Sequence, residues 1–131
     1  MSINHPKKIL IVDDEEDILT SLSIILRLAN YAVIFASSGR VAIELARKEL
    51  PDLIILDVLL HDIDGGSIVN ILLEEPTIAN IPILFLTGIL RNKEDLLIKK
   101  EGSGKRGSHF IMAKPVSKEE LLEMISKILT A

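Results

Sequence analysis

The residues Leu53-Ile54-Ile55-Leu56-Asp57 form an unbroken apolar run that ends on a carboxylate, and this run is the clearest indication of the fold. The run is too short for an ordinary helix, and it does not alternate with polar residues as a half-exposed strand does. It is typical of a strand covered on both faces, which is the usual condition of a parallel sheet. It therefore predicts a buried strand with Asp57 at its carboxyl end.

Similar apolar runs recur at residues 9–12, 32–35, 81–86 and 110–113, and segments with helical spacing lie between them. These segments cover residues 18–29, residues 38–50 before Pro51, and residues 68–73, which follow Gly65-Gly66 and precede Pro76. A last helix is expected to start at Ser117, with a capping box completed by Glu120. We also expect a short helix at residues 92–97, followed by a flexible loop at residues 102–108. The regular β-α alternation predicts a (βα)5 doubly wound, five-stranded parallel sheet with helices on both faces.

The length and composition of the chain are those of one globular domain. The chain has 131 residues, a formal net charge of −4 and 3% aromatic residues, and it contains no cysteine. These values argue against disulfides, thiolate metal sites and binding to nucleic acid through overall charge. Neither a secretory signal nor a membrane-spanning apolar run is found in the sequence, so we expect a cytoplasmic protein without membrane insertion.

Polar residues follow four of the five predicted strands. They are Asp13 and Asp14 after the first strand, Asp57 after the third, Thr87 after the fourth and Lys114 after the fifth. In a doubly wound sheet the functional crevice lies beyond the carboxyl ends of the strands. The sequence therefore predicts that these side chains meet at one edge of the sheet and form a site.

The charges of these residues indicate the chemistry of the site. Three carboxylates held close together repel one another, and a hard divalent cation such as Mg²⁺ relieves that repulsion. Asp13 and Asp14 are the better metal pair, while Asp57 stands alone and is the better nucleophile toward phosphorus. A phosphoryl group on Asp57 would find partners in the metal ion, the Lys114 ammonium and the Thr87 hydroxyl.

From Lys8 to Leu129 the chain resembles the receiver domain of two-component response regulators, of the CheY-like type with a flavodoxin-like fold. The matching motifs are Lys8-Ile9-Leu10-Ile11-Val12-Asp13-Asp14-Glu15, Leu53-Ile54-Ile55-Leu56-Asp57, Asp64-Gly65, Leu86-Thr87-Gly88 and Lys114-Pro115. The resemblance implies one receiver domain over residues 1–131, with its core at about residues 8–129.

The resemblance also implies a function for each site residue. Asp57 would accept a phosphoryl group from a histidine kinase or a histidine phosphotransfer protein, and the domain would assist that reaction without being an enzyme in the usual sense. Asp13, Asp14, Asp57 and the backbone carbonyl of Leu59 would bind Mg²⁺. Thr87 and Lys114 would contact the phosphoryl oxygens and couple phosphorylation to a surface that binds a downstream protein.

The sequence departs from the family pattern at three places. Leu60 and His61 stand where Met-Pro is common, and Ile111 stands where an aromatic residue is usual, with Phe110 one position earlier. The interval from Thr87 to Lys114 is several residues longer than usual. These departures leave the operation of an aromatic switch open. Leu59 and Ile89 are apolar and cannot orient water, which predicts a long-lived phosphoryl-aspartate.

The sequence also allows other roles for the acidic residues and other functions for the domain. The carboxylates of Asp13 or Asp14 could cap the first helix, and Asp57 could stabilise a turn. The domain could act as an interaction scaffold independent of phosphorylation, or as a small phosphatase with an aspartyl nucleophile. Its cognate kinase, its target and its oligomeric state are left open by the sequence.

Overall fold

The predicted parallel, doubly wound sheet is confirmed. The computed structural model describes residues 5–57, 65–87, 109–113 and 117–130. Within these residues the strands form one five-stranded sheet in the order β2-β1-β3-β4-β5, and every pair is parallel. The strands are β1 (Lys8–Val12), β2 (Ala32–Ala36), β3 (Leu53–Asp57), β4 (Ile83–Thr87) and β5 (His109–Ala113). The helices are α1 (Glu16–Leu28), α2 (Gly39–Glu49), α3 (Gly65–Leu73) and α5 (Lys118–Thr130).

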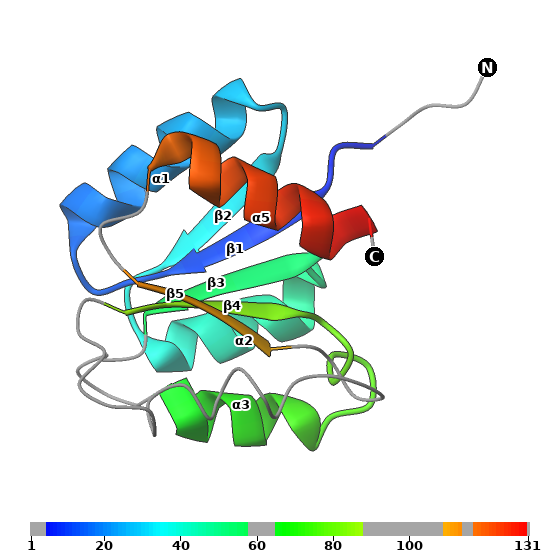
Figure 1. Cartoon of the computed structure of the whole chain (residues 1–131). Coiled ribbons are helices and arrows are strands. Elements are labelled where there is room, and N and C mark those ends of the chain that lie inside the picture. The colour runs from blue at the N-terminus through cyan, green and yellow to red at the C-terminus, as the bar shows by residue number, and fades with distance from the viewer. Residues whose placement is uncertain (1–4, 58–64, 88–108, 114–116, 131) are drawn as a thin grey trace.

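Helices cover both faces of the sheet, with α1 and α5 on one side and α2 and α3 on the other (Figure 1). Successive strand residues therefore enter different cores. In β3, Ile54 and Leu56 join the cluster under α2 and α3, while Leu53 and Ile55 join the cluster under α1 and α5. This double coverage is the physical reason that the strand sequences are apolar throughout.

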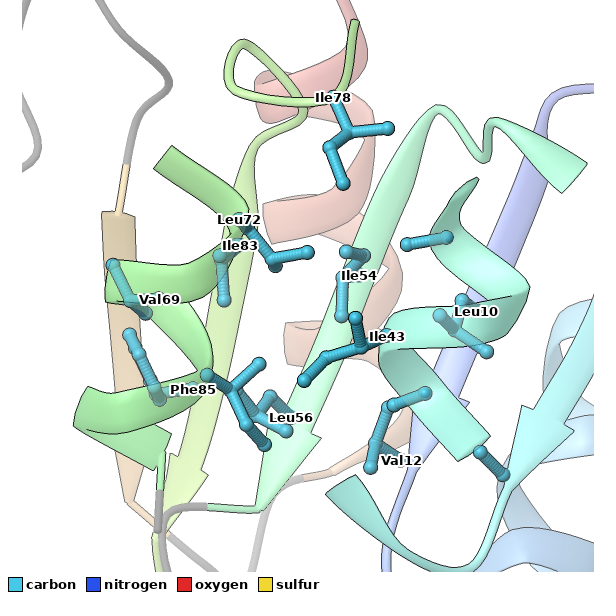
Figure 2. Packing of buried hydrophobic residues seen from close by; sticks show 14 residues of the cluster. Leu10, Val12, Ile43, Ile54, Leu56, Val69, Leu72, Ile78, Ile83 and Phe85 are labelled. Atoms are coloured by element: carbon cyan, nitrogen blue, oxygen red, sulfur yellow. The ribbon is translucent and has the colours of Figure 1, made fainter. Parts of the chain in front are cut away.

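Figure 2 shows the cluster between the sheet and the α2–α3 layer. Phe85 is fully buried there, beside Leu56 of the neighbouring strand and Val69 of α3. Ile43 of α2 reaches the same cluster from the other helix of this layer. This packing fixes β3 at the centre of the sheet, where Asp57 ends the strand.

The fourth strand begins later than the sequence predicts. We expected a strand from Ile81, but β4 starts at Ile83. The N–H of Ile81 donates to the carbonyl of Ile78 at 3.2 Å, which belongs to a turn. Pro82 has no N–H to offer a sheet, although its carbonyl accepts from the Ile54 N–H at 3.0 Å.

Local sequence signals explain the helix ends. The Ser38 hydroxyl caps α2 by accepting from the Val41 N–H at 3.3 Å, and Leu50 ends that helix in the left-handed region at φ 49°. The predicted capping box of α5 is present: the Glu120 N–H donates to the Ser117 hydroxyl at 3.0 Å, and the Ser117 N–H donates to the Glu120 carboxylate at 3.2 Å. The short helix and the loop expected at residues 92–97 and 102–108 lie outside the described residues.

Candidate functional site

Asp13 lies directly after β1 and is buried, with 2% of its surface exposed. Its N–H donates to the carbonyl of Ala36 at 3.1 Å, which joins the ends of β1 and β2. Its carboxylate accepts from the N–H of Glu15 at 2.9 Å, and Glu15 precedes the first residue of α1. The Asp13 side chain therefore stabilises the turn into α1 by accepting a hydrogen bond from a residue outside the helix proper.

Asp57 is the last residue of β3 and is partly buried. Because β3 pairs with both β1 and β4, Asp57 stands in the middle of the carboxyl edge of the sheet. Asp13 and Asp14 follow a different strand, β1, so only the pairing of β1 with β3 brings Asp57 close to them.

The carboxylates of Asp13, Asp14 and Asp57 form one cluster. Each offers one ligand oxygen, and these oxygens all lie within 4.8 Å of one another. Two oxygens on opposite sides of a Mg²⁺ ion are about 4 Å apart, because each bond is about 2.0–2.1 Å long. Oxygens that all lie within 4.8 Å of one another are therefore compatible with a shared Mg²⁺ ion. The donor set suits the ion as well, since Mg²⁺ prefers oxygen ligands and retains several waters.

The structure describes only some of the remaining predicted site residues. Thr87 ends β4, one residue after Leu86, which is the register partner of Asp57. Thr87 itself pairs with Ala113 at the end of β5, the residue that precedes Lys114. The backbone therefore brings Thr87 to the same edge as the acidic cluster. Lys114 and Leu59 lie outside the described residues, as do Leu60, His61 and Ile89.

The altered switch position lies in β5. Ile111 is partly buried and packs against the cluster under α2 and α3, whereas Phe110 packs on the opposite face with the α1–α5 cluster. Adjacent strand residues point to opposite faces, so Phe110 cannot replace an aromatic residue at position 111 by a simple rotation.

The sequence reasoning did not single out Ala36. Its carbonyl fixes the Asp13 backbone at the site, and an alanine at the end of a strand gives no chemical signal of such a contact. The available signal was positional, because Ala36 is the last apolar residue before Ser37 and Ser38.

Comparison with known proteins identifies the family of this chain. The family model described as response regulator receiver domain matches residues 9–126. The chain therefore belongs to the response regulator receiver family of two-component systems. Receiver domains are phosphoacceptors rather than enzymes in the usual sense, and they generally bind Mg²⁺.

The relatives include proteins about twice as long as this chain and a protein of about the same length. The chain is 40% identical over 123 residues to the alkaline phosphatase synthesis transcriptional regulatory protein PhoP of Bacillus subtilis, which covers 94% of this chain and 48% of PhoP. It is 28% identical over 122 residues to protein PilH of Pseudomonas aeruginosa, which covers 93% of this chain and 97% of PilH. The chain spans about half the length of the first curated relatives that it matches.

Solved structures share the fold over nearly the whole chain. The chemotaxis response regulator CheY4 of Vibrio cholerae superposes with a TM-score of 0.81 at 31% identity, covering 95% of this chain and 99% of CheY4. A putative response regulator from Chloroflexus aurantiacus gives a TM-score of 0.82 at 34% identity, covering 96% and 99% of the two chains. In the described part of this chain, no helix has the length and apolarity needed to cross a membrane.

Proposed function

We propose that Asp57 accepts a phosphoryl group in a Mg²⁺-dependent reaction, and that this modification switches a surface for protein binding. The observation that carries the proposal is the convergence of the Asp13, Asp14 and Asp57 carboxylates, whose ligand oxygens lie within 4.8 Å of one another. Two of these acids come from the loop after β1 and the third from β3. An arrangement built from separate strands at the carboxyl edge is the one expected of a ligand site in a doubly wound sheet.

Asp57 is the acceptor in this proposal. One oxygen of its carboxylate attacks the phosphorus of a phosphohistidine donor, a P–O bond forms, and the P–N bond of the donor breaks. The imidazole leaves and takes a proton from solvent. The central position of β3 holds the Asp57 backbone still during the transfer, because that strand is paired on both sides.

Asp13, Asp14 and Asp57 would hold Mg²⁺, with the Leu59 carbonyl as a further ligand. The bound ion supplies neutralisation of the negative charge that gathers on the phosphoryl oxygens. Asp13 is well suited to a fixed ligand role, because its backbone and one carboxylate oxygen are both held by hydrogen bonds. Thr87 and Lys114 contact the phosphoryl oxygens from the ends of β4 and β5.

The donor is a sensor histidine kinase or a histidine phosphotransfer protein, and the recipient of the signal is a downstream protein. Phosphorylation shifts an equilibrium between two surface conformations rather than creating a new activity. We place the protein in the cytoplasm. Because Leu59 and Ile89 cannot orient an attacking water, the phosphoryl group on Asp57 should persist for minutes or longer at neutral pH.

The test is transfer from acetyl phosphate with and without Mg²⁺, followed by mass spectrometry of the modified residue. We expect one phosphoryl group on Asp57, none after chelation of Mg²⁺, and none in Asp57→Asn. The matched control is Asp17→Asn, which makes the same chemical change at an exposed position in the first turn of α1.

Equal labelling of the parent and Asp57→Asn would refute the assignment. Labelling that vanishes within seconds would refute the long lifetime alone. A phosphatase of small substrates would be indicated instead if the parent turned over a chromogenic phosphate ester and Asp57→Asn did not.

A further inference from the structure

Strand β2 forms one edge of the sheet and pairs only with β1 in the described structure. The Ala32 N–H donates to the Lys7 carbonyl at 2.9 Å, and the Ala36 carbonyl accepts from the Asp13 N–H at 3.1 Å. In a parallel ladder, alternate residues bond to the same neighbour. The backbone groups of Ala32 and Ala36 thus face β1, while those of Val33 and Phe35 face away from it.

This edge lacks the usual protection against pairing with another strand. Edge strands are commonly guarded by charged side chains, proline or a bulge. The sequence of β2 is Ala-Val-Ile-Phe-Ala, which contains no charge, proline or glycine, and its register with β1 has no bulge. Phe35 leaves 51% of its surface exposed at this edge, which is a large apolar exposure for a strand residue.

A groove of about 580 Å³ runs beside the edge, between α1 and the end of β2. Its apolar lining includes Ile24, Phe35 and Val41, which are 55%, 51% and 40% exposed. Among the described residues, the buried Ser23 hydroxyl that lines the groove has no hydrogen-bond partner. The Ser23 hydroxyl is already buried and cannot reach a docked surface, so it is the exposed apolar lining of the groove that favours coverage by a second surface.

The charged residues that line the groove favour a second copy of this chain as its occupant. Glu16 lies in the first turn of α1 and Arg27 in its last turn, and both line the groove at opposite ends of the helix. A twofold axis reverses the direction of the second helix. It therefore brings the acidic end of each α1 to the basic end of the other, with Ile24 between them. Such self-complementarity is the requirement of a symmetric dimer interface.

We propose that two copies of this chain associate through β2 and α1 around such a twofold axis. Val33 of one copy pairs with Phe35 of the other in an antiparallel ladder, and the two sheets become one. The helix spacing is consistent with this arrangement. Since α1 packs over both β1 and β2, strands about 4.8 Å apart place the two α1 helices about 10 Å apart, which is a normal distance for packed helices.

The first test is the mass of the whole chain in solution, measured by sedimentation over a range of concentrations without a phosphoryl donor. We expect a concentration-dependent species of twice the 14.5 kDa of the chain. A chain that remains monomeric up to about 200 µM, where even a weak dimer would be populated, would overturn the proposal and leave this edge to a different protein.

Two substitutions test whether the free edge of β2 forms the dimer interface. Val33→Pro removes an N–H that points away from β1, so the fold can tolerate it while the antiparallel ladder cannot. Phe35→Lys places a charge on the edge. Both variants should be monomeric and should melt cooperatively. The matched control is Leu50→Lys, at a residue that is 56% exposed and outside the groove, and it should still dimerise.

Charge-reversal variants distinguish this dimer from a dimer that uses another surface of the protein. Glu16→Arg or Arg27→Glu alone places like charges together across the axis and should weaken association about tenfold or more. The double variant restores opposite charges and should recover most of the association. A dimer that neither single variant weakens, or that the double variant fails to restore, would contradict the proposed pairing. None of these readouts needs phosphorylation, so they are independent of the proposed function of Asp57.

Discussion

Val12 and Leu56 are register partners on the neighbouring parallel strands β1 and β3. The residues that follow them, Asp13 and Asp57, therefore leave the sheet at the same level although 43 intervening residues separate them in the chain. The acidic cluster is a consequence of this register, because a shift by one residue would turn the Asp57 side chain to the other face of the sheet. Strand pairing, rather than the local sequence, creates the site.

Mg²⁺ should stabilise the folded domain. The ion binds the carboxylate cluster of the native state, which the unfolded chain lacks because Asp57 is then far from Asp13 and Asp14. At a concentration ten times its dissociation constant it should raise the free energy of unfolding by about 1.4 kcal/mol, or the melting temperature by about 5 °C. Thermal melts of the parent with Mg²⁺ and with a chelator measure the shift.

The same melts on Asp13→Asn and Asp57→Asn should show a much smaller shift, because each variant removes one charged ligand. Asp17→Asn is the control and should respond as the parent does. An undiminished response in both cluster variants would mean that the ion binds elsewhere.

Phe85→Ala should be strongly destabilising. Phe85 has no exposed surface and lies in the cluster between the sheet and α2 and α3 (Figure 2). Truncation removes the buried ring and leaves a cavity, which should cost about 3–5 kcal/mol of unfolding free energy. Urea unfolding measures this value. Val41→Ala, at a 40% exposed position, should cost far less, and a loss under about 1 kcal/mol for Phe85→Ala would contradict the packing described.

Leu50→Gly should stabilise the protein. Leu50 has φ 49° and ψ 61° at the end of α2, a conformation that costs a residue with a Cβ about 1–2 kcal/mol. It is also 56% exposed, so little apolar burial is lost. We expect a net gain of about 0.5–1 kcal/mol in chemical unfolding, after the greater freedom of glycine in the unfolded chain is subtracted.

Asn30→Gly provides the comparison for this substitution. Asn30 also has positive φ, at 72°, but asparagine tolerates the left-handed region better than leucine does. The gain should therefore be smaller than that of Leu50→Gly. The reverse order would show that backbone conformation does not control stability at these two helix ends.

Ser117→Ala should destabilise α5 by about 1 kcal/mol, because it removes the acceptor of the Glu120 N–H. Chemical unfolding is again the measurement. The control is Ser126→Ala within the same helix, at an exposed position where alanine is the better helix former. This control should be neutral or slightly stabilising, and equal losses in the two variants would argue against the capping box.

Glu75→Gln should lower stability at neutral pH but not in acid. The Glu75 carboxylate accepts three hydrogen bonds from the guanidinium of Arg47, with the shortest at 2.6 Å, and this pairing lowers the pKa of Glu75 below its ordinary value of 4.5. A lowered folded-state pKa means that the contribution is present above pH 4.5 and is lost as the pH falls through the folded-state pKa.

The melting temperatures of the parent and Glu75→Gln should therefore differ slightly at pH 7 and converge near pH 3. High salt should reduce the difference at pH 7, because both groups are exposed. A difference that persists unchanged in acid would assign the effect to something other than the charge pair.

The fold class, the alternation of strands and helices, and the family were all predictable from the amino-acid sequence. The unbroken apolar run at residues 53–56 required coverage on both faces, and Ser117 with Glu120 marked the start of α5, because these signals act over a few neighbouring residues. The start of β4 was placed two residues too early, since an apolar pattern does not reveal that Ile81 bonds within a turn.

The strand order, the separation of the Asp13, Asp14 and Asp57 ligand oxygens by no more than 4.8 Å, and the contact between Asp13 and Ala36 were visible only in the folded structure. The tertiary structure also decided that β2 would be an edge with Phe35 exposed beside a groove. The physical reason is that apolar residues in β1, β2 and β3 look alike in the sequence. Which strand is central and which lies at the edge depends on pairings between residues far apart in the chain, and no local pattern encodes them.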